Sequence, residues 1–497
     1  MDLWTFQRYE QPRLCVDAID CHESDSIVTL RAGPHQYRLA FDNASAASEI
    51  AAELTTLRNS KAPLWTALKE AEPDTGWYEL MRFLDTRSLI GETRDPEHGL
   101  AEQASTIEAY IDETAITVID ALPSNRRALA ATYAASQREV LRNGQIPRGA
   151  YRGNMDPFNP EEHSNFYLAL LALEFQYFRR SCLLTLAAVE KLLARIAGHE
   201  DSRIDLTQDP EFSEVSGVFD LRDLQCHLWL IAQCIARSTS EHAERFKTAP
   251  TPKLTLASGL EFMRQTELLT RETLAMWGPN RYVVALEQLT DPDSSLIAGP
   301  YIEQYHVTRR FVEIVAPLLS TRLATPLRNM MFRYFGEEFG HEALESATCE
   351  ALGVTKHALD VMLPLPLHFA FVDALTTMAD LDPVTSFAAV MVIEGVFGEP
   401  PKLSLRLQSV GETSPAFRTV SKEHDELNET LNHNSISRDC FENISAVSAL
   451  RQLQTIRRVL FLLELNHRAW DDIAGFYGSQ RKLTIQGPFG RPLDPQM

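Results

Sequence analysis

The chain has 497 residues, of which 44 % are hydrophobic and 23 % are charged, and its formal net charge is −21. This composition is ordinary for a globular protein with sizeable cores, and the length predicts several domains. The acidic balance argues against partners that need basic patches, so we expect no nucleic acid and no anionic membrane surface as a ligand. No apolar run reaches the length of about 20 residues that a membrane span needs.

Cysteine use and the N-terminus both predict a cytoplasmic protein. The seven cysteines are scattered, and no two of them have C-x-x-C spacing. This pattern favours reduced thiols over a disulfide framework or a zinc ribbon. The first residues, from Met1 to Phe6, have no basic region followed by an apolar stretch, so no signal peptide is predicted.

Residues 1–95 differ from the rest of the chain and predict a small N-terminal α+β domain. Two short strands, 27–31 and 37–41, are joined by a turn that contains Gly33 and Pro34. Three short helical patterns follow, at 48–57, 63–71 and 76–87. One interpretation is a structural domain that only packs on the rest of the chain.

This order of elements resembles the winged-helix domain that recognises the leader peptide in ribosomal peptide biosynthesis, the RiPP recognition element. The resemblance implies a precursor-peptide ligand. An extended peptide would add to the edge of the hairpin, where main-chain hydrogen bonds hold it. The residues expected to meet its side chains are Tyr37, Leu39, Trp77, Leu80 and Phe83.

Residues 91–100 read as a linker, and helical patterns dominate from there to about residue 480. We therefore predict a mainly α chain, with a helical domain at 101–250 and a second helical bundle at 251–480. Helices are expected at 104–121, 125–143, 160–197, 220–246, 256–276, 298–320, 325–353, 356–378, 384–397, 416–432 and 442–475. Residues 481–497 contain several Gly and Pro residues and are expected to form an irregular tail.

The most informative motif is Glu338-x-x-His341, because a carboxylate and an imidazole three residues apart share one face of a helix. Helical bundles use this spacing to hold iron or manganese. Glu345 would lie on the same face. Alternatively, Glu338 and His341 are a hydrogen-bonded pair at a helix surface.

Two further residues extend the candidate metal site. Glu394 is the only charge between Val384 and Phe397, and a buried carboxylate needs a cation or a proton. His424 fills a gap in an apolar stripe that includes Val420 and Leu427, so it is expected to point into the core. The other interpretations are a salt bridge from Glu394 to an arginine and an ordinary core histidine at 424.

Residues from about 255 to 480 resemble the haem-oxygenase-like diiron oxidases. The residues that carry the resemblance are Glu338 and His341, the later Ala351-Leu352-Gly353, Glu394, and His424 at the start of the family's His-x-x-x-Asp-x-x-His pattern. In this register Asn428 replaces the aspartate and Leu431 replaces the last histidine. A second register places Asp425 on the aspartate but loses both histidines.

The resemblance implies a non-haem iron oxidase that uses O₂ on an amino-acid-derived or leader-bearing peptide substrate in natural-product biosynthesis. The implied metal ligands are Glu338, His341, Glu394 and His424, for one iron, with Asn428, Asp425 or Glu345 as further ligands if a second iron binds. A homodimer is left open. Two alternatives remain: a metal-free bundle that serves as a peptide-binding partner protein, and a thiaminase-type hydrolase with Cys349 as nucleophile.

Overall fold

A computed structural model of the chain describes residues 12–59, 76–92, 96–142, 165–181, 186–199, 204–216, 221–240, 246–251, 253–290, 295–395, 407, 433–480, 482–488 and 491–497. The chain divides into two compact units, Met1–Gln103 and Ala104–Met497. Helices predominate, so the prediction of a mainly α chain is confirmed. None of the described helices is long and apolar enough to cross a membrane.

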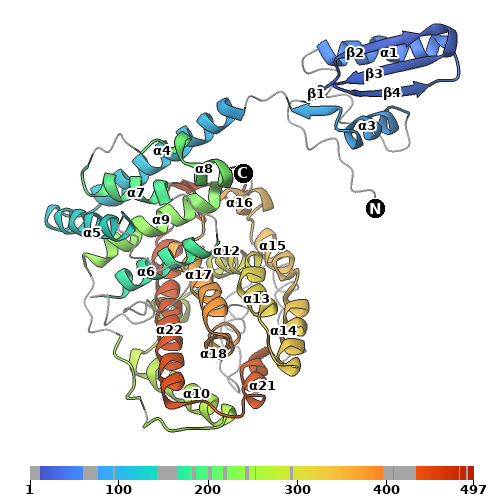
Figure 1. The fold of residues 1–497 in the computed structure, drawn as a ribbon. Coiled ribbons are helices and arrows are strands. Elements are labelled where there is room, and N and C mark those ends of the chain that lie inside the picture. The colour runs from blue at the N-terminus through green and yellow to red at the C-terminus, as the bar shows by residue number, and fades with distance from the viewer. Residues whose placement is uncertain are drawn as a thin grey trace. The chain divides into compact units, whose positions relative to one another are not determined.

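The N-terminal unit is a three-stranded antiparallel sheet with helices packed on it (Figure 1). Its elements are β1 (Pro12–Leu14), β2 (Ala18–His22), η2 (Glu23–Asp25), β3 (Ile27–Ala32), β4 (His35–Ala40), α1 (Ala44–Asn59), α3 (Gly76–Thr86) and β5 (Ile90–Glu92). The predicted hairpin is present as β3 and β4. The sequence analysis missed β2, which pairs with β3, and the short ladder between β1 and β5. The helix predicted at 63–71 lies outside the described residues.

The core of this unit lies between the sheet and its helices. Val28 and Leu30 of β3, together with Leu54 of α1 and Leu84 of α3, are completely buried. Strand β4 forms one edge of the sheet, in the order β2-β3-β4. The ring of Tyr37 on this strand makes an edge-to-face contact with Phe83 of α3, with 6.2 Å between the ring centroids. This contact places aromatic surface beside the edge strand.

The larger unit is built from helices, and the region expected to be a separate domain at 101–250 belongs to it. Its first helices are α4 (Pro96–Asp120, which begins in the N-terminal unit), α5 (Ser124–Arg142), α6 (Phe166–Ser181), α7 (Leu186–Ile196), η4 (Leu206–Gln208), α8 (Pro210–Ser216) and α9 (Leu221–Ser238). The predicted linker at 91–100 is therefore shorter than expected. Helices α6 and α9 pack on each other and both contact α17 (Pro366–Leu381).

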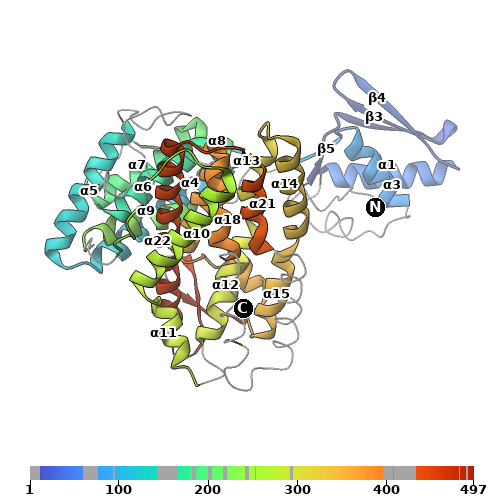
Figure 2. The ribbon, with the colours of Figure 1, turned by 90° about the horizontal axis from the view of Figure 1, so that it is seen from below.

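The remaining helices of the larger unit include a long helix near the C-terminus, drawn in red (Figures 1 and 2). They are α10 (Gly259–Trp277), α11 (Arg281–Glu287), α12 (Ser295–Arg309), α13 (Phe311–Ser320), α14 (Thr325–Glu338), α15 (His341–Ala351), α16 (Lys356–Val361), α18 (Pro383–Glu394), η5 (His433–Ser435), α21 (Ile436–Glu442) and α22 (Ala449–Tyr477). Helix α22 contacts α10, α11, α12, α17 and α18. Most of its buried residues are apolar, but Gln452, Thr455, Arg458, Glu464 and His467 are buried as well.

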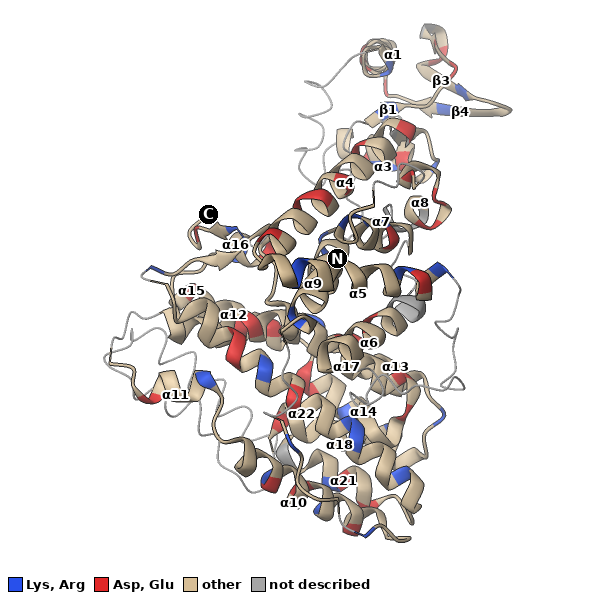
Figure 3. Cartoon of the chain, turned by 90° about the vertical axis from the view of Figure 1, so that its left-hand side faces the viewer, with Lys and Arg blue, Asp and Glu red and all other residues tan. Residues whose placement is uncertain are grey.

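Ion pairs join helix α4 to helix α7. Helix α4 carries acidic residues and no Lys or Arg, and they are the red bands along it in Figure 3. Lys191 and Arg195 of α7 pair with Glu108 and Asp112 of α4. The Arg195–Asp112 pair is exposed, and exposed ion pairs contribute little stability, about 1 kcal/mol or less each. They nevertheless favour one orientation of the two helices.

The C-terminal residues are more ordered than the predicted irregular tail. Strands β6 (Ile485–Gln486) and β7 (Pro492–Leu493) form a short antiparallel ladder. The amide N–H of Leu363 donates to the carbonyl of Gln486 at 2.8 Å, and Ile485 is completely buried. These two strands therefore form a small ladder that packs on the helices.

Candidate metal centre

The Glu-x-x-His motif spans a break between two helices and does not lie on one continuous helix. Glu338 is the last residue of α14 and His341 is the first residue of α15. Between them Gly340 has φ of +93°, a backbone conformation that L side chains rarely adopt. The predicted helix at 325–353 is therefore wrong in this respect. The two side chains still meet, because Nδ1 of His341 lies 2.8 Å from Oε2 of Glu338.

A histidine that the sequence analysis did not select completes the cluster. Nδ1 of His433, in η5, lies 2.7 Å from Oε1 of Glu338 and 3.7 Å from Oε2 of Glu394. Ligand atoms of Glu338, Glu394 and His433 all lie within 4.8 Å of one another, close enough to hold one metal ion. His433 is 3 % exposed and Glu338 is 7 % exposed. The donors are thus two carboxylates and one imidazole from three separate segments.

The neighbouring residues hold these donors in position. Nε2 of His433 lies 3.3 Å from Oε2 of Glu337, so its Nδ1 is directed at the two carboxylates. The hydroxyl of Tyr334 donates a hydrogen bond to Oε1 of Glu394. Hydrogen-bonded partners of this kind orient metal ligands and strengthen metal binding. This arrangement fits a metal ion better than a chance contact between polar side chains.

The charges in the cluster depend on each other. Burial alone would raise the pKa of Glu338, but hydrogen bonds from His341 and His433 outweigh it and lower that pKa to about 2. Burial would likewise lower the pKa of His433, but Glu338 and Glu394 raise it to about 10. Burial and the adjacent Glu394 raise the pKa of Tyr334 well above its ordinary value. Without a metal, a proton on His433 therefore takes the place of a cation.

Because His433 binds this proton more tightly in the folded state, the stability of the metal-free protein should depend on pH. Because the pKa of His433 is about 10 in the folded protein and 6.5 ordinarily, the folded state holds the proton more tightly. The resulting stability is complete below pH 6.5 and is lost as the pH rises through about 10. We expect the difference in unfolding free energy between wild type and His433→Gln, measured by urea denaturation in excess chelator, to shrink over this range. A difference that stays constant with pH would contradict the assignment.

The structure places two of the four residues predicted as metal ligands in the group of mutually close ligand atoms, and it does not describe His424. Glu338 and Glu394 belong to this group, whereas His341 contacts Glu338 from outside it. Among the residues that the structure describes, Glu394 contacts His433 and Tyr334 and no arginine, unlike in the alternative interpretation. His424, Asp425 and Asn428 lie outside the described residues, so neither register is tested. Glu345 is buried in α15, and it is not part of the group of mutually close ligand atoms.

Cys349 does not have the properties of a catalytic nucleophile. Its side chain is completely buried in α15. Burial raises the pKa of its thiol well above the ordinary value, and Glu345 and Glu303 raise it further. A nucleophilic cysteine needs a lowered pKa and access to substrate. The structure therefore gives no support to the thiaminase-type alternative.

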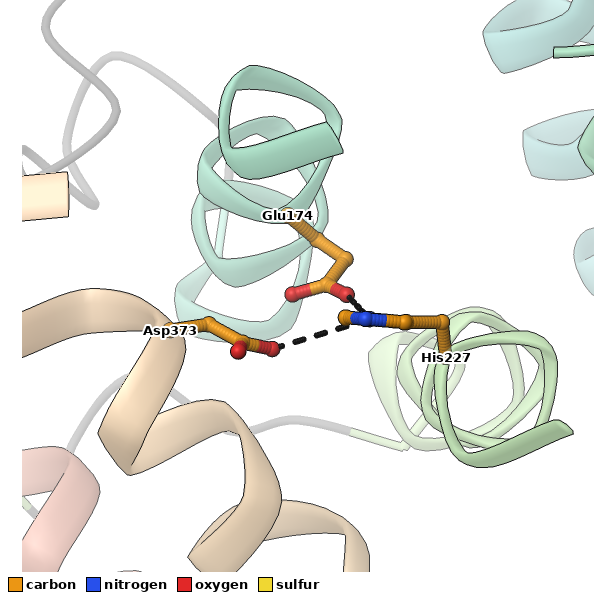
Figure 4. Close-up of side chains that lie close together, drawn as sticks. All are labelled: Glu174, His227 and Asp373. Atoms are coloured by element: carbon orange, nitrogen blue, oxygen red, sulfur yellow. Dashed lines mark hydrogen bonds and ion pairs between the residues drawn. The ribbon is translucent and has the colours of Figure 1, made fainter. Parts of the chain in front are cut away.

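A second carboxylate–histidine group was missed. Glu174 of α6, His227 of α9 and Asp373 of α17 have ligand atoms within 4.8 Å of one another (Figure 4). His227 is buried on a largely apolar helix. Glu174 and Asp373 are each the only acidic residue within a long apolar stretch of their helix, which is the signal that selected Glu394. That signal would have found them.

Comparison with known proteins adds little about function. No protein-family model and no curated protein matches the sequence. Among solved structures, the chain is similar to a domain of unknown function with a haem oxygenase-like fold from Shewanella denitrificans. The two are 17 % identical, with a TM-score of 0.36, and the match covers 44 % of this chain and 92 % of that chain. No activity is assigned to that domain, so function has to be argued from the side chains described above.

Proposed function

We propose that the chain is a non-haem iron, O₂-dependent oxidase with a haem-oxygenase-like bundle. The observation that carries this proposal is the group of Glu338, Glu394 and His433, whose donor atoms converge on one point while Glu337 and Tyr334 orient them. Imidazole and carboxylate ligands with open positions suit iron(II) that reacts with O₂. Such an iron would supply electrons and a binding position for O₂.

The residues around this centre have separate tasks in the proposal. Glu338 and Glu394 balance the charge of the ion, and His433 contributes its Nδ1 once the proton there has left. His341 bonds to the second oxygen of Glu338 and fixes the direction of that carboxylate. Phe311 packs edge-to-face on Tyr334, with 5.2 Å between ring centroids, and helps to keep the hydroxyl on Glu394.

Anaerobic loading with iron(II) tests the proposal. We expect wild type to hold one more iron per chain than Glu338→Gln, and to consume O₂ when air is admitted. Glutamine keeps the size of the side chain but removes the charge, so the variant should fold and lose this ion. Elemental analysis and an oxygen electrode give the two readings. Equal iron content in the two proteins would instead favour the metal-free, peptide-binding alternative.

The substrate class is the second part of the proposal: an amino-acid-derived or leader-bearing peptide in natural-product biosynthesis, held in part by the N-terminal unit. Strand β4 is an edge strand, and Tyr37 and Leu39 on it and Trp77, Leu80 and Phe83 on α3 are only partly buried against the core of the unit. An extended peptide can add to such an edge and place its side chains on the aromatic surface.

Selection from a random peptide library on the full chain tests this surface. We expect selected peptides to bind wild type in the micromolar range, about −8 kcal/mol, and the Tyr37→Ala, Phe83→Ala double variant at least about tenfold more weakly. Phe332→Ala, which removes an exposed ring from the larger unit, is the control and should change nothing. Equal binding by all three proteins would show that this unit is structural only.

A further inference from the structure

Glu174, His227 and Asp373 form a polar group at the contact of α6, α9 and α17 (Figure 4). All three side chains are almost completely buried, with exposed fractions of 0 %, 1 % and 0 %. A single ring nitrogen faces both carboxyl groups: Nδ1 of His227 is hydrogen-bonded to Oε1 of Glu174 and lies 3.7 Å from Oδ2 of Asp373. One N–H can donate a good hydrogen bond to only one of these oxygens. A cation between Nδ1 of His227, Oε1 of Glu174 and Oδ2 of Asp373 would contact all three atoms.

The charges around the group leave an excess of negative charge. Nη2 of Arg310 lies 2.6 Å from Oδ1 of Asp373 and 2.7 Å from Oε2 of Glu313. Its single positive charge is therefore shared between two carboxylates, and Glu174 adds a third. When all three are ionised the network carries two negative charges that Arg310 does not neutralise. A divalent cation would balance this excess.

Among the described residues, one oxygen of each buried carboxyl group lacks a hydrogen-bond donor, which also favours a bound cation. Within the part of the chain that the structure describes, Oε2 of Glu174 and Oδ2 of Asp373 are inaccessible to water and accept no hydrogen bond. Such atoms need a cation or a proton, because a bare buried carboxylate costs several kcal/mol, on the order of 2–7 or more.

We propose that Glu174, His227 and Asp373 bind a divalent transition-metal ion that fastens α6 and α9 to α17. One imidazole and two carboxylates suit zinc, manganese or iron(II). Complete burial leaves no approach for a substrate, so the ion has a structural role. This site is built from residues that the proposed oxidase centre does not use, and either can be present without the other.

Zinc serves as the probe, since it accepts these ligands and undergoes no redox change. Full-length protein is stripped with chelator, saturated with zinc, freed of excess and analysed for metal content. In the His433→Ala background, where the first centre is disabled, we expect one zinc per chain. Adding Glu174→Gln should remove it. His368→Gln is the matched control, since it changes another buried histidine on α17, one that packs against Trp470, and should leave the zinc in place.

The Glu174→Gln variant distinguishes a group that binds a metal ion from a group that is only protonated. Glutamine has the shape of a protonated glutamate, so a group that holds only a proton would tolerate Glu174→Gln with unchanged metal content and melting temperature. A metal site would lose both its zinc and the rise in melting temperature that zinc produces. If the Glu174→Gln protein fails to fold, the His433→Ala protein still decides. One bound zinc that raises its melting temperature supports the site, and absence of zinc overturns it.

Discussion

The His433→Gly protein is expected to lose at least about 100-fold in affinity for the metal at the Glu338–Glu394–His433 centre. Changes in residues that merely orient ligands cost about 10–100-fold, and loss of a ligand should cost at least as much. The variant leaves Glu338 and Glu394 in place with a cavity between them. Competition with a chelator of known affinity, at fixed pH, measures the change.

Free imidazole makes this experiment specific. A small cavity left by the missing ring can accept imidazole from solution, so added imidazole should restore metal binding to His433→Gly. A purely structural histidine would not be replaced in this way. His357→Ala removes an exposed histidine of α16 and serves as the control. Unchanged metal affinity in His433→Gly would show that His433 is not a ligand. His424, which lies outside the described residues, would then be the next histidine to test.

The Asp382→Ala protein is expected to be less stable by about 3–5 kcal/mol, the usual result of breaking a buried ion pair from one side. Asp382 caps α18, and its Oδ2 accepts hydrogen bonds from Arg451 at 2.7 Å, Arg458 at 2.8 Å and the hydroxyl of Thr385 at 2.7 Å. Its side chain is 1 % exposed and that of Arg458 is 7 % exposed. Removing the carboxylate leaves the buried guanidinium without this counter-charge.

Urea denaturation measures the loss, and a surface pair provides the comparison. Asp120 lies 3.2 Å from Arg127 with 63 % of its side chain exposed, so Asp120→Ala should cost no more than about 1 kcal/mol. Similar losses in the two variants would show that the Asp382 network contributes no more than a surface pair. Because Asp382 begins the helix that ends at Glu394, the variant should also weaken the metal centre.

Much of the fold could be predicted because its helices have clear ends and apolar faces. The hairpin of β3 and β4 was found from two short strand patterns joined by a turn that contains Gly33 and Pro34. The break inside the helix predicted at 325–353 was missed because the Glu-x-x-His spacing was read through Gly340. A glycine after an apolar residue is a common helix stop, and here it has the positive φ that such a stop requires.

The sequence identified two of the three residues of the metal centre, Glu338 and Glu394, but not His433. Glu394 was found because a lone charge in an apolar stretch must have a partner. His433 belongs to the short 3₁₀ helix η5, His433–Ser435, where no helical period indicates which way a side chain points. Its place beside Glu338 depends on how distant segments pack, and the spacing of neighbouring residues carries no information about that.

The ends of two helices determine how the centre responds to charge. Glu338 is the last residue of α14 and Glu394 is the last residue of α18. The C-terminal end of a helix carries a partial negative charge from its free carbonyl groups, so a carboxylate there is disfavoured by about 0.3–1 kcal/mol. Both macrodipoles thus oppose the two anions and favour a positive ion beside them. In this protein the backbone itself, through the direction of α14 and α18, adds to the attraction for a cation.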